Sequence, residues 1–518
     1  MARYIIDLNK SYKTCLSFWA GKLNGRSFVQ KTMIREEKTR MKKRLVSVLL
    51  CTTMLATMLA GCGGGDGGSS NGGGDDTKAE KGSAEDFDWK NCEGTTINVM
   101  FNEHNYSKAV ISKLDEFEEK TGITVEYSST PEGNYFDKLN TSLSSRSGTP
   151  DVFMTGAYQV WEYASAGYME PLDDYINNPA KTASDYNFDD FIPATVDSLR
   201  WDLVPGHAVG EGSQWALPMG WELNNLAYNK NVFEEKSLEV PTTTDELLET
   251  AKTLKEFNGS GSYGVAVRGT RDWATIHPGY MSLFATWGGQ DFAIEDDKLV
   301  CQLDSKEAIE MTDYWVELIK AGGPSQWSNY TWYEASSDLG AGKAAMLFDA
   351  TSAGYFQNFE GASDQSGNIA WSTIPLPEGK TEADMKANVW IWSMAMNADS
   401  KNKDAAWMFL QYFTSPEYML YSGTEGASPD TPRQSVMDSD EYKETVGSAE
   451  NYLESIAILS ENATIQFTPQ PYFFECTTKW AEVLQHLVLT DKYESTEAAM
   501  KQLKKDLDAV VADLEVSE

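Results

Sequence analysis

The sequence has few of the residues that build metal sites and disulfide frameworks. It contains six cysteines and four histidines in 518 residues. The cysteines show no CxxC spacing, and no two histidines are four residues apart. Neither a zinc site nor an HExxH metalloprotease motif is therefore predicted. We expect no metal and no cofactor.

Motifs of nucleotide-binding and hydrolytic enzymes are also missing. No GxSxG is present, and Gly340–Ala345 fails as a phosphate-binding loop because Ala344 follows Lys343 where Ser or Thr is needed. The acidic runs 295–297 and 438–441 lack EF-hand spacing and are expected to be solvated. No catalytic residue is predicted, although the many carboxylates leave an acid–base pair open.

Positive charge is scarce. Lys plus Arg number 43 against 78 Asp plus Glu, a net charge of −35. A surface this acidic repels phosphate backbones, so nucleic acid is not expected as a partner. Hydrophobic residues make up 41% and aromatic residues 12% of the chain, which indicates a folded, soluble body. The length predicts about three compact units or one large multi-lobed body.

The chain has no hydrophobic run long enough to cross a bilayer near its start. Met41-Lys42-Lys43-Arg44 precedes the apolar run 45–58, whose 14 residues fall short of the roughly 20 that span a membrane. This pattern predicts an export signal that is removed, with a retained short membrane helix as the alternative. Translation is expected to start at Met41, with Met1 left open, and residues 1–61 are read as the signal with its upstream extension.

Leu59-Ala60-Gly61-Cys62 resembles a bacterial lipobox. The resemblance implies cleavage before Cys62 and attachment of a diacylglycerol to its sulfur, which would tether the protein to the outer face of the cell membrane. Residues 62–93 begin with a Gly-rich stretch and are expected to be a flexible spacer. Three cysteines then remain, Cys92, Cys301 and Cys476, with one bridge at most.

The body of the chain alternates between strand-like and helical patterns. Strand-like runs are expected at 96–101, 123–127 and 151–154, with helices at 106–120 and 134–145 between them. A second block contains strand-like 226–229 and 264–267 and helices at 244–256, 277–287 and 305–321. Strand-like runs at 344–349, 369–374 and 389–396 precede a largely helical C-terminus. This order predicts an α/β fold with parallel strands in two lobes.

Seven segments in a fixed order carry a resemblance to the family 1 extracellular solute-binding proteins, the capture subunits of bacterial ABC importers for sugars. They cover roughly residues 94–515 and are Phe117–Val125, Gly148–Val152, Ala166–Asp173, Leu217–Lys230, Val240–Glu246, Gly342–Met346 and Ser400–Trp407. A second set resembles the branch that binds sugar alcohols and small sugars: Gly323-Pro324, Trp332–Glu334, Phe348–Ala353, Trp390–Trp392 and Pro432–Ser435.

The resemblance implies a two-lobed fold of the periplasmic binding protein type II, with strands that cross between the lobes near 217–222 and 376–392. Residues 94–217 and 343–388 are assigned to the first lobe. Residues 218–342 and 389–518 are assigned to the second. Closure of the lobes about a hinge would trap the ligand.

The chemistry of a sugar site points to polar and aromatic side chains that follow strands. Hydroxyls need carboxylates, amides or Arg, and the C–H face of a sugar packs on an aromatic ring. Open α/β sheets place ligands at the carboxyl ends of strands. The ligand-binding candidates at such positions are Asn102, His104, Tyr158, Gln159, Trp161, Trp221, Glu222, Arg271, Trp273, Asp349, Trp390, Trp392 and Arg433. Trp390 and Trp392 share one strand face, so either both line the cleft or both pack a lobe.

The sequence thus predicts a non-catalytic, monomeric, extracytoplasmic lipoprotein. It would capture a sugar or sugar alcohol and deliver it to the transmembrane subunits of an ABC permease. The alternative is a surface lipoprotein enzyme that acts on glycans, as a glycosidase does. The ligand's identity, its chain length and the permease are left open.

Overall fold

Two separate β-sheets organise the chain. The computed structural model describes residues 83, 86–426 and 428–516. The first sheet has the strand order β2-β1-β3-β13-β6. Its strands are β1 (Thr96–Asn102), β2 (Thr124–Thr130), β3 (Val152–Gly156), β6 (Leu217–Glu222) and β13 (Trp390–Met396). The strand β1 pairs in parallel with β2 and β3, whereas β13 runs antiparallel to β3 and β6.

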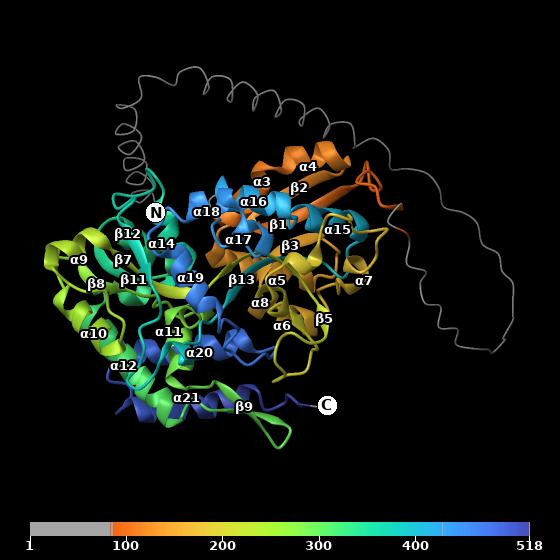
Figure 1. Ribbon diagram of the computed structural model, residues 1–518. Coiled ribbons are helices and arrows are strands. Elements are labelled where there is room, and N and C mark those ends of the chain that lie inside the picture. The colour runs from red at the N-terminus through yellow and green to blue at the C-terminus, as the bar shows by residue number, and fades with distance from the viewer. Residues whose placement is uncertain (1–82, 84–85, 427, 517–518) are drawn as a thin grey trace, which may run out of the picture. The chain divides into compact units, whose positions relative to one another are not determined.

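The second sheet has the order β12-β7-β11-β8. Its strands are β7 (Asn224–Asn229), β8 (Tyr263–Ala266), β11 (Ala344–Ala350) and β12 (Ile369–Ser372). Here β8 is parallel to β11, and β7 is antiparallel to β11 and β12. We call the first sheet and its helices the first lobe, and the second sheet and its helices the second lobe. Figure 1 shows the first lobe on the right and the second on the left.

Helices pack against both sheets, and the central strands are buried on both faces as a result. Those of the first lobe are α3 (Asn105–Ser112), α4 (Leu114–Thr121), α5 (Glu132–Ser144), α6 (Ala157–Ser165), α8 (Pro193–Asp197), α15 (Lys403–Tyr412) and α16 (Pro416–Thr424). Those of the second lobe are α9 (Lys230–Lys236), α10 (Thr244–Thr253), α11 (Gly279–Trp287), α12 (Lys306–Gly322), α13 (Trp332–Gly340), α14 (Thr351–Asn358) and α19 (Tyr452–Ser460).

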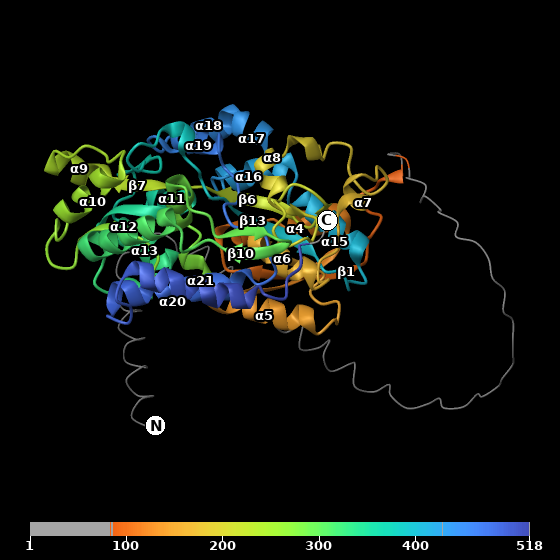
Figure 2. The same ribbon diagram turned by 90° about the horizontal axis from the view of Figure 1, so that it is seen from below.

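The remaining elements join and flank the lobes. They are α7 (Asp173–Ile176), α17 (Gln434–Asp438), α18 (Asp440–Val446), α20 (Phe473–Leu489), α21 (Thr496–Val510) and the hairpins β4 (Arg200–Trp201)–β5 (Ser213–Gln214) and β9 (Phe292–Glu295)–β10 (Lys298–Cys301). The helix α20 packs on α12 of the second lobe and also touches α6 of the first. Figure 2 shows α20 and α21 running beside α12.

The sequence pattern locates most elements within two or three residues, with one break that it missed. The helix expected over 106–120 is divided at Lys113, whose ψ of 7° leaves the helical range. The second part ends at Thr121, and Gly122, with a φ of +71°, closes the helix in the left-handed conformation.

The predicted division into lobes differs from the strand pairing. The segment 343–388, assigned to the first lobe, contains β11 and β12 of the second sheet. The segment 389–518, assigned to the second lobe, begins with β13, which lies inside the first sheet between β3 and β6. The reason is that β11 pairs with β7 and β8 and β12 pairs with β7, so the chain enters the second lobe only at β7 and returns to the first only at β13.

The lobes are joined by a one-residue crossing and by a longer one. Leu223 alone separates β6 of the first sheet from β7 of the second. A second crossing leads from β12 to β13 through Asn388, whose Nδ2 donates to the Tyr158 hydroxyl oxygen at 2.8 Å and to the carbonyl of His277 at 2.7 Å. Its Oδ1 accepts from the backbone N–H of Gln466 at 2.9 Å. One buried amide therefore ties a first-lobe helix, a second-lobe loop and the segment that leads to α20.

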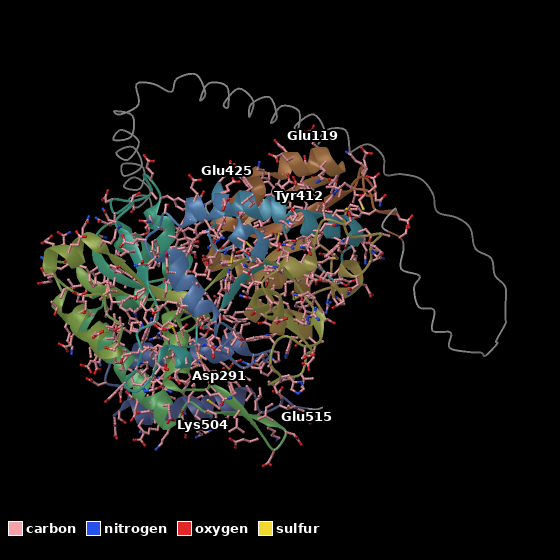
Figure 3. All side chains as sticks on the ribbon, viewed as in Figure 1. Glu119, Asp291, Tyr412, Glu425, Lys504 and Glu515 are labelled. Atoms are coloured by element: carbon pink, nitrogen blue, oxygen red, sulfur yellow. The ribbon has the colours of Figure 1, made fainter. Side chains whose placement is uncertain are left out.

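Acidic side chains lie on the surface of the described part of the chain. Figure 3 shows Glu119, Glu425 and Glu515 on the periphery, and all three are exposed. Among the described residues, no helix is long and apolar enough to cross a membrane. Residues 1–61, Cys62 and most of the predicted spacer lie outside the described part of the chain.

Candidate functional site

A small cavity lies between the two lobes. Its volume is about 20 Å³, and it adjoins an outer groove of about 480 Å³. The side chains and backbone around it come from both lobes and are His104, Glu132, Glu222, Arg268, Trp273, His277, Trp332, Ala350, Ser352, Ala353, Phe356, Trp390 and Trp392. The cavity holds about one water molecule, so a larger ligand requires its walls to move apart.

A buried cation on the second lobe anchors one wall. The Arg268 guanidinium donates from Nε and Nη2 to the two carboxylate oxygens of Asp349 at 2.9 and 2.6 Å. Its Nη1 donates to the carbonyl of Ala274 at 3.2 Å and lies 3.0 Å from Nε2 of His277. Asp349 is the second-to-last residue of β11 and Arg268 follows β8, so neighbouring parallel strands bring the pair together. Both side chains are buried.

The contact with Arg268 fixes the tautomer of His277. A guanidinium can only donate, so Nε2 of His277 accepts and Nδ1 carries the hydrogen. Burial and the Arg268 charge hold the pKa of His277 well below 6.5, so the ring is neutral. Nδ1 is buried and has no hydrogen-bond partner among the described residues. The site thus contains a donor that a ligand oxygen could satisfy.

A carboxylate of the first lobe faces Arg268. Glu132 begins α5, and its Oε2 accepts from Nε1 of Trp332 at 3.1 Å and from Nδ2 of Asn102 at 3.4 Å. The bond to Trp332 crosses between the lobes, because Trp332 begins α13. Oε1 of Glu132 has no hydrogen-bond partner among the described residues and remains free to accept. Burial raises the pKa of Glu132 despite these donors.

A second carboxyl group, Glu222, ends β6 just before the crossing at Leu223. It is 5% exposed, and its Oε1 accepts from the Ser352 hydroxyl at 2.9 Å. Thr351, the neighbour of Ser352, donates to the buried Asp430 at 2.7 Å. Burial raises the pKa of Glu222 to about 8 and that of Asp430 to about 7. At neutral pH Glu222 is therefore mostly protonated and can donate as well as accept.

The raised pKa of Glu222 predicts a pH-dependent stability. Its folded-state pKa lies above the usual 4.5, so its contribution is fully present below about pH 4.5 and is lost as the pH rises through about 8. The Glu222→Gln variant keeps the acceptor for Ser352 and removes the ionisation. We expect urea unfolding to show that the free energy of unfolding of the wild type falls between pH 5 and pH 9 by on the order of 4 kcal/mol more than that of Glu222→Gln. Parallel pH profiles of the two proteins would contradict this account.

Indole rings form the remaining walls. Trp390 and Trp392 both line the cavity, with ring centroids 5.1 Å apart and planes at 90°. Trp273 lies 5.0 Å from Trp390, and His104 lies 4.9 Å from Trp392. Burial lowers the pKa of His104 to about 3, so this ring is also neutral. Apolar ring faces next to a few polar atoms are what the C–H and O–H groups of a sugar require.

Five of the predicted ligand-binding residues line the cavity: His104, Glu222, Trp273, Trp390 and Trp392. Asn102 and Asp349 do not line the cavity but bind residues that do. Asn102 donates to Glu132, and Asp349 accepts from Arg268. Tyr158 packs behind Trp390 at 5.1 Å and donates its hydroxyl to the carbonyl of Val389.

The other predicted residues lie away from the cavity. Gln159, Trp161 and Trp221 are buried and do not line it. Arg271 is half exposed and donates to Gln485 at 2.7 Å. Arg433 is fully buried in the first lobe, where its guanidinium stacks 3.6 Å over the Phe191 ring and donates to the carbonyl of Thr414.

Six polar or aromatic residues of the site were missed from the sequence: Glu132, Arg268, His277, Trp332, Ser352 and Phe356. Trp332 lies in a segment that resembles the polyol-binding branch, and this was the available signal. Arg268 follows the apolar run of β8 directly, just as Asn102 ends β1. Nothing in the local pattern distinguishes Glu132 or His277 from their neighbours.

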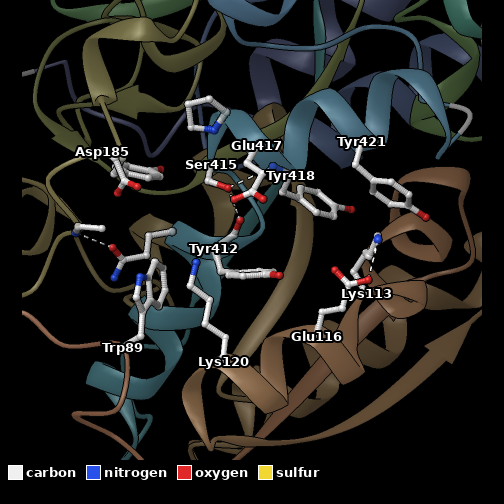
Figure 4. Close-up of a pocket in the computed structure, with 14 residues that line it drawn as sticks. Trp89, Lys113, Glu116, Lys120, Asp185, Tyr412, Ser415, Glu417, Tyr418 and Tyr421 are labelled. Atoms are coloured by element: carbon white, nitrogen blue, oxygen red, sulfur yellow. Dashed lines mark hydrogen bonds and ion pairs between the residues drawn. The ribbon is translucent and has the colours of Figure 1, made fainter. Parts of the chain in front are cut away.

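A second hollow lies on the first lobe, with a volume of about 310 Å³. Figure 4 shows Lys113 beside Tyr421 and Lys120 beside Tyr412. Lys113 lies 2.7 Å from Glu116 and 4.3 Å from the Tyr421 ring centroid, and Lys120 lies 4.6 Å from that of Trp89. Because lysines already cover these ring faces, this hollow is a poorer sugar site than the interlobe cavity.

No metal centre is found in the part of the chain that the structure describes: no three His, Cys, Asp or Glu side chains are grouped to hold an ion. Cys92, Cys301 and Cys476 are free thiols. Burial raises the pKa of Cys301 to about 12, so it is unreactive at neutral pH.

Comparison with known proteins identifies the family. Residues 102–420 match the family described as bacterial extracellular solute-binding protein. The chain belongs to this family. Among curated relatives of this solute-binding protein, the erythritol/L-threitol-binding protein of Mycolicibacterium smegmatis is 39% identical over 79% of this chain and 86% of that protein. The mannitol-binding protein of Pseudomonas aeruginosa is 26% identical over 73% of this chain and 82% of that protein.

Solved structures of ABC-transporter solute-binding proteins share the fold. One from Agrobacterium radiobacter, in complex with ribitol, superposes with a TM-score of 0.70 at 21% identity, covering 81% of this chain and 99% of that chain. One from Agrobacterium vitis with bound D-mannitol gives a TM-score of 0.68 at 21% identity, over 81% and 99% of the respective chains. The two-lobed α/β architecture expected from the sequence is thereby confirmed.

Proposed function

We propose that this solute-binding protein captures a neutral sugar or sugar alcohol in the interlobe cavity, with four-carbon alditols as the first choice. The observation that carries the proposal is the set of unsatisfied polar atoms between indole rings: Oε1 of Glu132, Oε2 of Glu222 and Nδ1 of His277. The 39% identical erythritol/L-threitol-binding relative supports a short ligand.

Each part of an alditol has a counterpart in the cavity. Hydroxyl hydrogens can be donated to Oε1 of Glu132, and hydroxyl oxygens can accept from His277 and from protonated Glu222. The carbon chain packs on the Trp390 and Trp392 rings. Because the two lobes supply different groups, the ligand completes contacts that neither lobe can make alone, and closure follows from that difference.

Capture without chemistry is proposed over glycan hydrolysis. A glycosidase needs an ionised carboxylate opposite a carboxylic acid across an open subsite, whereas Glu132 is held by Trp332 and Glu222 by Ser352 in a nearly closed cavity. The solute would pass from this chain to the membrane subunits of an ABC importer. We further propose that Cys62 carries a lipid anchor that keeps the monomer outside the cell at the membrane surface.

Thermal unfolding and titration calorimetry with erythritol, L-threitol, ribitol, mannitol and maltose test the proposal. A ligand present at 100 times its Kd adds about 2.7 kcal/mol to the free energy of unfolding. We expect an alditol to raise the Tm and to be recovered unchanged by chromatography. A cleaved ligand would favour the glycosidase, and no response to any of the five would contradict capture of this ligand class.

A further inference from the structure

The cleft carries more negative than positive charge. Of the described residues that line the cavity and its outer groove, Arg268 is the one Lys or Arg, and the acidic ones are Glu132, Asp137, Glu222, Asp272 and Glu334. Arg268 is already neutralised by Asp349 at 2.6 Å. His104 and His277 are neutral because burial lowers their pKa. A ligand that enters therefore meets more carboxyl groups than cations, because the one cation, Arg268, is shared between Asp349 and the acidic residues of the cleft.

Glu132 is the member of this group placed to contact a ligand. Its Oε2 is held by the indole N–H of Trp332 at 3.1 Å, which leaves Oε1 without a hydrogen-bond partner among the described residues. A partly buried carboxylate is costly without a donor or a positive charge beside it. Burial raises the pKa of Glu132, and the Trp332 and Asn102 donors and the Arg268 charge offset this rise only in part.

Aromatic rings around Glu132 suit a cation as well as a sugar. Trp273, Trp332, Trp390, Trp392 and Phe356 all line the cavity. Ring faces attract ammonium groups, most strongly in sites removed from water, and an aromatic cage beside a carboxylate is a recurrent cation site. A neutral hydroxyl at Oε1 would satisfy the hydrogen bond but would add no positive charge to a cleft in which carboxyl groups outnumber cations.

We propose that the cleft also binds ammonium-bearing polyols, with the ammonium on Oε1 of Glu132 against the Trp332 ring and the hydroxyls toward Glu222 and His277. This inference rests on the proposed function, because it uses the same cavity for the hydroxyl-bearing chain. The same charges exclude polyols that carry a carboxylate or a phosphate, since neither anion finds a free cation in the cleft.

Calorimetry at pH 7 with three four-carbon ligands tests the inference: erythritol, 1-amino-1-deoxyerythritol and erythronate. We expect the amine to bind at least as tightly as erythritol and erythronate to bind about 100-fold more weakly. If erythritol binds and the amine binds more weakly, the inference is overturned while the proposed function stands. If erythritol fails to bind and the amine binds, the proposed function fails and the cation site stands.

A pair of variants locates the ammonium. Glu132→Gln keeps the shape and one acceptor but removes the charge, so amine affinity is expected to fall about tenfold more than erythritol affinity. Glu119→Gln removes an exposed charge of the first lobe that lines neither the cavity nor its outer groove, and it is expected to leave the ratio of the two affinities within about twofold. Equal losses of both ligands in Glu132→Gln would overturn the placement, and the wild-type comparison remains decisive if that variant does not fold.

Discussion

Replacement of Asp349 by alanine is expected to lower the free energy of unfolding by about 3–5 kcal/mol. The variant leaves the buried Arg268 guanidinium without its two charge-assisted bonds of 2.9 and 2.6 Å. The freed guanidinium would turn toward Glu132 or Glu222 and occupy the cavity, so ligand affinity should also fall by at least about tenfold. Urea unfolding and calorimetry with the best alditol measure the two effects.

Two further variants distinguish the loss of the Arg268–Asp349 ion pair from nonspecific destabilisation of the fold. The double variant Arg268→Met/Asp349→Ala removes both charges and is expected to be more stable than Asp349→Ala alone, although it too should lose affinity. Glu310→Ala removes an exposed partner of Lys306 on α12 and should leave stability nearly unchanged. If Asp349→Ala lowered the free energy of unfolding as little as Glu310→Ala does, the buried charge of Arg268 would not need this carboxylate.

Gly156→Ala is expected to reduce ligand affinity about 100-fold, although it adds only one methyl group. Gly156 ends β3, and a Cβ at this position would lie 1.9 Å from Cη2 of Trp390. Its φ of −133° suits any residue, so the effect comes from the ring and not from backbone strain. The Trp390 indole must shift toward the cavity. Calorimetry measures the affinity, and near-ultraviolet circular dichroism reports the altered indole packing.

Gly133→Ala provides the matched control. Gly133 lies in the first turn of α5 next to Glu132, and a Cβ there meets no atom within 4 Å. Alanine favours the helix by about 0.5–1 kcal/mol over glycine, so stability should rise slightly while affinity is unchanged. Equal affinity losses in both glycine variants would mean that Trp390 does not shape the cavity.

The sequence predicted the individual elements well because their patterns are local. The run 96–101 became β1 and the run 344–349 became β11, since apolar residues at strand spacing are buried whichever sheet they join. Which sheet they join depends on partners far away in the chain. Residues 390–396 are as apolar as 344–350, and nothing within either run indicates that the first pairs with β3 and the second with β7.

The site was predicted only in part, because some of its residues follow a local pattern and others depend on partners far away in the chain. Alternation predicted that Trp390 and Trp392, at the start of β13, share one strand face, but it did not indicate whether this face lines the cleft or packs a lobe. Arginines could not be placed from the local pattern: Arg268, Arg271 and Arg433 look alike in the sequence. One is buried at the cavity with Asp349, one is half exposed on Gln485, and one fills the first lobe beside Phe191. Only three-dimensional pairing of a buried charge with its counter-charge separates these roles.

The one-residue link between β6 and β7 sets an order of events during capture. Glu222 directly precedes Leu223, so we expect it to lie close to the axis about which the lobes rotate and Trp332, at the start of α13, to lie farther from that axis. Displacement during rotation grows with distance from the axis. An arriving solute would therefore find Glu222 and its neighbour Trp390 nearly in their final places. The contact between Trp332 and Glu132 would be the last to form and the first to break, so changes at Trp332 should alter the residence time of the solute more than its rate of arrival.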